Sequence, residues 1–251
     1  MEDISGNPNS AGKLQISRSS TIAVLVLSFL VGVGIGRFSM PSSGPNSLFD
    51  AYLNWLDDSG KETWKNTYWL GVPIQKCPWD SWVYQEIIYE TKPDVLIETG
   101  TFQGGSALFF ASIFGLLKRG RVLTIDIEKY PPMPQNERIT YLLGSSTADA
   151  IFQQVKNSIR PGERVMVSLD SDHHKDHVLK ELKLYSGLVT PGNYLVVEDT
   201  ANGHPNLPSF GPGPLQAVEE FLKNNSNFTQ DKSREKWGIS GFRGGWLKRV
   251  R

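Results

Sequence analysis

Cysteine is nearly absent from this chain, and neither sign of charge is in excess. The 251 residues include one cysteine, Cys77, which excludes an internal disulfide bond and a zinc site built from cysteines. Lysine plus arginine number 26, as do aspartate plus glutamate, so no net field attracts nucleic acid. The basic tail that ends at Arg251 is better explained as the solvated end of a strand. Nucleic acid is therefore disfavoured as a partner.

The chain has room for one α/β domain with a sizeable core, after a separate first stretch of about forty residues. Strands and helices alternate from residue 95 onward, which predicts a Rossmann-like, doubly wound and mostly parallel sheet with helices on both faces. The last two strands have no helix between them and predict an antiparallel hairpin at one edge. The predicted strands are 95–99, 121–127, 139–143, 164–169, 194–198, 237–241 and 245–250, and the predicted helices are 104–118, 147–158, 175–187 and 213–224.

The segment between Arg18 and Arg37 has no charged residue and contains an apolar run at residues 22–35. As a helix it would be about 27 Å long, enough to cross a thin membrane such as that of the endoplasmic reticulum. A cleaved signal peptide is the alternative, but Arg37 stands in its cleavage region. We expect a tail at 1–20, a transmembrane anchor at 21–37, a linker at 38–47 and one folded domain at 48–251.

Basic residues precede the apolar run, which favours a cytosolic N-terminus and a domain in the lumen of the endoplasmic reticulum or Golgi. Glycosylation sequons at Asn224 and Asn227 give mild support, although sequons also occur by chance. After the linker, apolar residues at helical spacing around Phe49 and Leu53 predict a short amphipathic helix, laid on the domain or on a membrane surface.

A glycine turn follows the strand 95–99 and opens a helix, so a ligand can approach the backbone there. The dinucleotide fingerprint is missing because Phe102 stands where its second glycine belongs, and no P-loop lysine precedes Ser106. What remains is a ligand without phosphate, whose amine Glu98 could help to hold and whose ribose Asp126, at the end of the next strand, could bind. S-adenosylmethionine (AdoMet) has both groups. A tight turn packed for its own sake is the alternative.

Four carboxylates follow the ends of two predicted strands: Asp170 and Asp172 after one, Glu198 and Asp199 after the other. Carboxylates a few Å apart raise one another's pKa, so such a site shares protons or holds a metal. Oxygen ligands with imidazoles nearby favour Mg²⁺ or Mn²⁺. The alternative is that the first pair caps a helix and the second is a solvated strand end.

Several motifs occur in the order found in the cephalosporin hydroxylase-like and rhamnosyl O-methyltransferase family, a branch of the AdoMet-dependent methyltransferase fold. The resemblance covers about Leu70 to Val250. It includes GVPI at 71–74, YQEII at 84–88, ETGT at 98–101, GGSAL at 104–108, LDSDH at 169–173, VEDT at 197–200, GPGP at 211–214 and GGWLKR at 244–249.

This resemblance implies a class I methyltransferase fold and methyl transfer from AdoMet to a hydroxyl group, assisted by Mg²⁺ or Mn²⁺. It places the metal on Asp172, Glu198 and Asp199. The segment 172–176 also resembles the metal-and-base segment of catechol O-methyltransferases, which implies Lys175 as the base. The residues expected to bind the cofactor are Glu98, Gly100, Phe102, Gly104, Ser106, Asp126, Ser146 and Asp170.

Methyl transfer needs two oriented substrates and a group that takes the hydroxyl proton. We predict Lys175 and His204 as catalytic residues, with His173 and His174 as further candidates. A surface salt bridge is the alternative for Lys175. The expected acceptor is a sugar, a glycolipid or a small molecule, and a homo-oligomer is left open. The alternative functions are a membrane-tethered binding protein without catalysis and a hydroxylase, as one family name suggests.

Overall fold

The computed structural model describes residues 48–56, 63–204 and 211–251, all within one compact unit that spans Pro45–Arg251. The predicted anchor at 21–37 lies outside the described residues, as do the tail and linker beside it. Among the residues that are described, no helix has the length and apolar composition needed to span a membrane.

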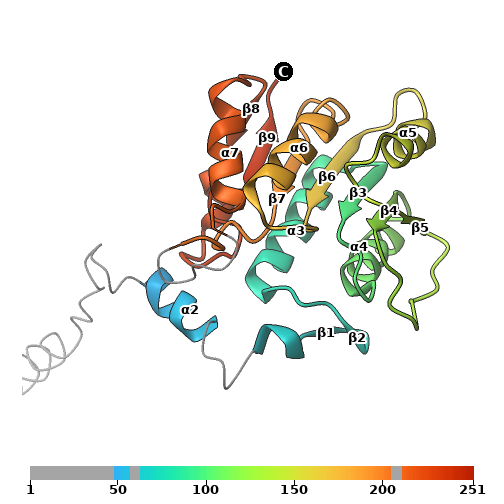
Figure 1. The fold of residues 1–251 in the computed structure, drawn as a ribbon. Coiled ribbons are helices and arrows are strands. Elements are labelled where there is room, and N and C mark those ends of the chain that lie inside the picture. Colours follow the sequence, from blue (N-terminus) through green and yellow to red (C-terminus); the bar gives the residue numbers. More distant parts are fainter. Residues whose placement is uncertain (1–47, 57–62, 205–210) are drawn as a thin grey trace, which may run out of the picture. The chain divides into compact units, whose positions relative to one another are not determined.

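A seven-stranded sheet crosses the described unit in the order β5-β4-β3-β6-β7-β9-β8 (Figure 1). The first five strands are parallel, whereas β9 is antiparallel to both β7 and β8. The predicted class I methyltransferase-like sheet with an antiparallel hairpin is therefore confirmed. The strands are β3 (Val95–Thr99), β4 (Arg121–Asp126), β5 (Ile139–Leu143), β6 (Val165–Leu169), β7 (Tyr194–Val197), β8 (Phe228–Gln230) and β9 (Trp246–Arg249).

One predicted strand is wrong. The partner of β9 is Phe228–Gln230, and the segment predicted as a strand at 237–241 forms turns after the short helix η2 (Lys232–Glu235). Gly238, within that segment, has a φ angle of 73°, whereas β-strand residues have negative φ angles. The buried carboxylate of Asp80 holds this loop by accepting the N–H of Gly241 and the hydroxyl of Ser240.

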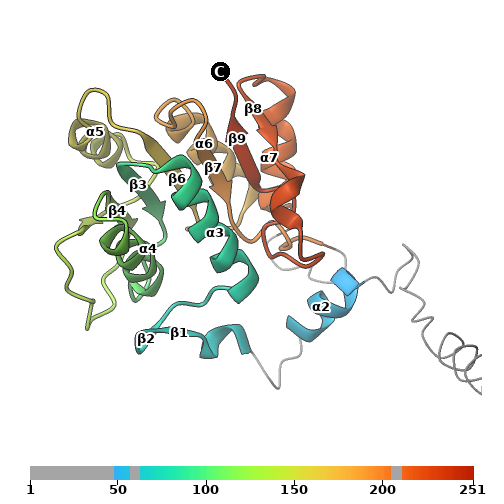
Figure 2. The same cartoon turned by 180° about the vertical axis from the view of Figure 1, so that it is seen from behind.

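Helices cover both faces of the sheet (Figures 1 and 2). On one face α3 (Pro78–Thr91) and α4 (Gly105–Leu116) pack on strand residues such as Leu96 and Met166. On the other, the neighbouring strand residues Ile97 and Val167 pack on three helices. These are α5 (Asp149–Ser158), α6 (Lys175–Tyr185) and α7 (Pro214–Lys223). Because β3 and β6 are buried on both faces, their sequences are apolar without alternation.

Four short elements precede α3 and cover the edge of the sheet where the parallel strands end. They are α2 (Leu48–Leu56), η1 (Thr63–Asn66), β1 (Tyr68–Trp69) and β2 (Val72–Pro73). The ring of Trp69 lies 5.0 Å from that of Phe109, and its Nε1 donates to Ser112 Oγ on α4. Phe49 and Leu53 of α2 are buried together with Ala201, so the predicted amphipathic helix packs on the domain.

Gly105 fixes how closely β2 approaches α4. A Cβ atom at this position would lie 2.0 Å from the carbonyl oxygen of Pro73, and a backbone atom cannot turn aside. We expect Gly105→Ala to cost about 1–3 kcal/mol in unfolding free energy, as overpacking does. Denaturant titration measures this. Gly187→Ala is the control, since its methyl group would meet nothing within 4 Å. Equal stability of the two variants would contradict the close contact.

Candidate functional site

A cavity of about 1250 Å³ opens where β3 and β6 end. The strand order reverses between these two strands, and doubly wound sheets bind ligands at that point. Sites for one small molecule usually measure roughly 300–1,000 Å³. The cavity is therefore large enough for a cofactor and an acceptor together.

The glycine turn after β3 forms the floor of this cavity. Gly100 has a φ of +86°, and an added Cβ would lie 1.9 Å from the carbonyl oxygen of Asp170. Only glycine lets the turns after β3 and β6 approach so closely. Of the predicted cofactor residues, Gly100, Phe102, Ser106, Asp126, Ser146 and Asp170 line the cavity.

Asp126 at the end of β4 holds the turn and also faces the cavity. Its Oδ2 accepts the N–H of Phe102 at 2.8 Å and its Oδ1 accepts that of Glu128 at 3.1 Å. Phe102 has a φ of +46°, which is uncommon for a bulky residue. Its ring lies 5.0 Å from that of Tyr130, and both rings line the cavity. This corner combines an aromatic wall with a carboxylate.

Glu98 and Gly104, also predicted to bind the cofactor, are not among the lining residues. Glu98 is fully buried beneath the turn, and its Oε2 accepts the hydroxyl of Thr124 at 2.7 Å. Burial raises the pKa of Glu98 to about 7, against the opposing attraction of the charged Lys76. Glu98 therefore packs beneath the turn, bonded to Thr124 of β4, and does not face the cavity.

A buried ammonium group lies among the acids. Lys76 Nζ is 2.8 Å from Asp170 Oδ2 and 2.5 Å from Glu198 Oε2. Burial alone would lower the pKa of Lys76, but the charges of Asp170 and Glu198 outweigh it and the pKa is raised. The other oxygen of Glu198 accepts the hydroxyls of Tyr84 and Ser168, each at 2.7 Å. Both oxygens of Glu198 are thus engaged within the protein.

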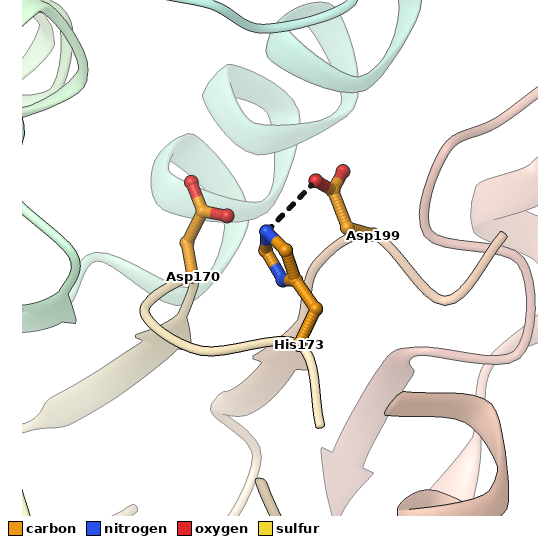
Figure 3. A group of neighbouring side chains, drawn as sticks. All are labelled: Asp170, His173 and Asp199. Carbon is orange, nitrogen blue, oxygen red and sulfur yellow. Dashed lines mark ion pairs between the residues drawn. The ribbon is translucent and has the colours of Figure 1, made fainter. Parts of the chain in front are cut away.

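The structure brings together Asp170, His173 and Asp199 as a group that could hold a metal ion (Figure 3). Their ligand atoms all lie within 4.8 Å of one another, and His173 Nε2 is 3.4 Å from Asp199 Oδ2. Burial raises the pKa of both aspartates, and neighbouring carboxylates raise it further. Asp199 also adopts a φ of +51°, a strained conformation of the kind found at functional sites.

Of the three metal ligands implied by the resemblance, Asp199 belongs to this group, whereas Asp172 and Glu198 do not. Asp172 lies outside it: its Oδ1 accepts the backbone N–H of His174 and lies 2.6 Å from that residue's Nδ1. Glu198 adjoins the group but is occupied by Lys76, Tyr84 and Ser168. Asp170 follows β6 directly, whereas Asp172 belongs to the turn that begins α6.

The two predicted catalytic residues do not line the cavity. Lys175 Nζ forms an ion pair with Glu220 Oε2 at 2.7 Å, which joins α6 to α7, so the surface salt bridge considered above is what the structure shows. His204 packs its ring edge-on against Phe49 at 5.8 Å. His173 and His174 do line the cavity, and His173 is the one in the metal-binding group.

Lys76 was missed in the sequence, although a signal was present. It is the only charged residue between Lys65 and Asp80, in a segment otherwise made of apolar residues, prolines and uncharged polar residues. A single charge in such a segment must be solvated or paired. Its partners, far along the chain, could not be inferred without the fold.

Comparison with known proteins identifies the family. The family model described as Rhamnosyl O-methyltransferase/CmcI matches residues 61–250. The chain belongs to this family. The resemblance seen in the sequence is thereby confirmed, and with it the enzyme class, an AdoMet-dependent O-methyltransferase.

Relatives within the rhamnosyl O-methyltransferase/CmcI family are similar over most of their length. The rhamnosyl O-methyltransferase of Mycobacterium leprae is 38% identical over 212 residues, which cover 81% of this chain and 91% of that one. The protein of the same name from Mycobacterium tuberculosis (strain ATCC 25618 / H37Rv) is 38% identical over 238 residues, 88% of this chain and 96% of that one.

Among solved structures, the apo form of CmcI aligns with a TM-score of 0.60 at 21% identity, over 74% of this chain and 77% of CmcI. A CmcI structure described as containing Mg and SAM aligns with a TM-score of 0.58 at 20% identity, over 74% and 78% of the two chains. At this identity the likeness establishes the shared fold.

Lys76 generates a stability prediction for this member of the family. Lys76→Met should leave Asp170 and Glu198 unpaired and cost about 3–5 kcal/mol when divalent cations are chelated. Added Mg²⁺ should restore part of that loss, because a bound cation replaces the missing charge. Thermal unfolding with EDTA and with Mg²⁺ measures both effects. Lys175→Met, which removes an exposed ion pair, should respond little to either condition. If Lys76→Met in EDTA is as stable as the parent, Lys76 does not neutralise these acids.

Proposed function

We propose that this protein transfers the methyl group of AdoMet to a sugar hydroxyl group, with a divalent cation at Asp170 and Asp199 and with His173 as the general base. One observation carries the proposal: the carboxylate and imidazole group lines the same cavity as the glycine turn and Asp126. A protein that only binds its ligand would not need this combination. Membership of the O-methyltransferase family argues against the two alternatives, a membrane-tethered binding protein and a hydroxylase.

The predicted cofactors, AdoMet and Mg²⁺, agree with the CmcI structure described as containing Mg and SAM. In this chain Asp126 fits the ribose hydroxyls, and Phe102 and Tyr130 offer apolar surface to the adenosine. Carboxylate oxygens are the preferred ligands of Mg²⁺, and Asp170 and Asp199 supply them. The raised pKa of each also fits, since a cation would stabilise the ionised forms.

A cation bound by Asp170 and Asp199, with the imidazole of His173 outside its coordination, would supply positive charge that makes an acceptor hydroxyl more acidic. The acceptor oxygen attacks the sulfonium methyl carbon in line as the sulfur–carbon bond breaks. The hydroxyl proton passes to the imidazole of His173, whose Nε2 lies 3.4 Å from Asp199 Oδ2. The products are a methyl ether and neutral S-adenosylhomocysteine. The cavity contributes mainly by aligning the two substrates.

An aromatic part of the cavity wall suits a sugar. Trp64, Trp79 and Tyr52 line it, and the two indoles are 37% and 42% exposed. Aromatic rings there provide rigid apolar surface with polar edges, which matches the C–H face of a pyranose. The name of the mycobacterial relatives, rhamnosyl O-methyltransferase, agrees with a sugar acceptor.

The location of the protein also remains a proposal. We propose a single-pass anchor at 21–37 with the domain in the lumen of the endoplasmic reticulum or Golgi. The uncharged run between Arg18 and Arg37 supports it, as do Asn224 and Asn227, which are exposed as glycan acceptors must be.

The test of this function is transfer of labelled methyl groups from AdoMet to rhamnosides and other sugars in the presence of Mg²⁺. We expect His173→Gln to lower the transfer rate by about 10²–10⁴-fold, the usual contribution of a general base. AdoMet affinity, measured by calorimetry, should be unchanged because His173 lies on the cation side of the cavity.

His174→Gln is the matched control, since His174 is the adjacent imidazole and pairs with Asp172. It should retain most of the activity. If His174→Gln lost its activity while His173→Gln kept it, the general base would be His174 and the assignment to His173 would be wrong. Failure of the parent protein to bind AdoMet at all would refute the proposed function.

A further inference from the structure

A group of large apolar side chains is exposed beside the mouth of the cavity. Trp79 and Trp82 lie one turn apart on the outer face of α3 and are 42% and 58% exposed. Trp237, in the loop before β9, is 48% exposed, and Leu48, at the start of α2, is 58% exposed. We call these four residues the aromatic ridge. Single exposed apolar residues are ordinary, but a cluster of them marks an interaction surface.

Contacts join the members of the aromatic ridge into one surface. Trp82 Nε1 donates to Glu86 Oε1 at 3.0 Å, and Lys236 Nζ lies 2.5 Å from Glu86 Oε2. The same Nζ lies over the ring of Trp237, 5.6 Å from its centre. Gly238, the residue after Trp237, lies close to Leu48, since a Cβ added to Gly238 would be 3.9 Å from Leu48 Cδ2. The start of α2 therefore borders this surface. Trp79 belongs both to the ridge and to the cavity lining.

The charge and the composition of the ridge point to one kind of partner. Its two central charges, Glu86 and Lys236, form an ion pair and so add no net charge to the surface. Indoles that combine an apolar ring with a polar N–H concentrate at the headgroup level of lipid bilayers.

The chain upstream gives an independent reason to choose a bilayer. The apolar run at residues 22–35 is separated from Leu48 only by residues 36–47. At about 3.3–3.6 Å per residue that segment reaches at most about 45 Å. If the run enters a membrane, the start of α2 therefore stays near the same membrane surface.

We propose that the aromatic ridge rests on the headgroup layer of a lipid bilayer, which places the mouth of the cavity at the membrane surface. Trp79 connects the ridge to the cavity, because it belongs to the ridge and also lines the cavity.

The test uses the full chain reconstituted into phosphatidylcholine vesicles whose acyl chains carry bromine near the headgroup. Bromine quenches indole fluorescence at short range. The fluorescence of the parent minus that of Trp82→Phe or Trp237→Phe gives the emission of the missing indole. Comparing this emission in brominated and unbrominated vesicles gives the quenching of that indole. Leu116→Trp supplies the control, since Leu116 is 84% exposed at the end of α4, on the opposite edge of the sheet from the cavity.

We expect the indoles of Trp82 and Trp237 to be quenched in brominated vesicles and the indole introduced by Leu116→Trp to be unaffected. Quenching at Trp82 and Trp237 no greater than at the control would overturn the proposal. If those indoles were instead shielded from acrylamide in detergent solution by a dimer seen in light scattering, the ridge would be an interface between copies of the chain. Since no methyl transfer is measured, neither result depends on the proposed activity, which AdoMet binding tests separately.

Discussion

The site depends on the ion pairs that one buried lysine, Lys76, forms with Asp170 and Glu198. Asp170, Glu198 and Asp199 meet at the edge of the sheet with raised pKa values, a costly arrangement for ionised groups. Lys76 lies between Asp170 and Glu198 and neutralises part of that charge. Because one ammonium cannot balance three ionised carboxylates, net negative charge remains in this group. The residual charge is what a divalent cation would compensate.

Backbone packing holds this arrangement in place. Gly100 and Gly105 sit where a side chain would collide with the carbonyl oxygens of Asp170 and Pro73. These contacts press the turn after β3 against the turn after β6 and hold β2 against α4, just ahead of the segment that carries Lys76. The reversal of strand order between β3 and β6 then leaves the cavity open above them. The fold thus brings the glycine turn after β3 and the acidic group after β6 and β7 to the same cavity.

The sequence predicted features that depend on local pattern. Apolar runs located the parallel strands, and the glycine turn with Asp126 located one side of the cavity. Features set by contacts between distant segments could not be predicted. The resemblance implied Asp172 as a metal ligand, whereas the structure groups Asp170 with His173 and Asp199 and pairs Asp172 with His174. Lys175 is one position into α6, where the helix directs it to Glu220. The partners of Lys76 lie 94 and 122 residues away, beyond any local pattern.

The position of the cation tests the central claim most directly. Crystals of the protein grown with AdoMet and Mn²⁺ would show the ion by anomalous diffraction. The account predicts a peak at about 2.0–2.3 Å from oxygens of Asp170 and Asp199, where hard cations bind carboxylates, with Lys76 still paired to Glu198. A peak at Asp172, or an ion that displaces Lys76 from Glu198 and binds away from Asp170, would contradict it.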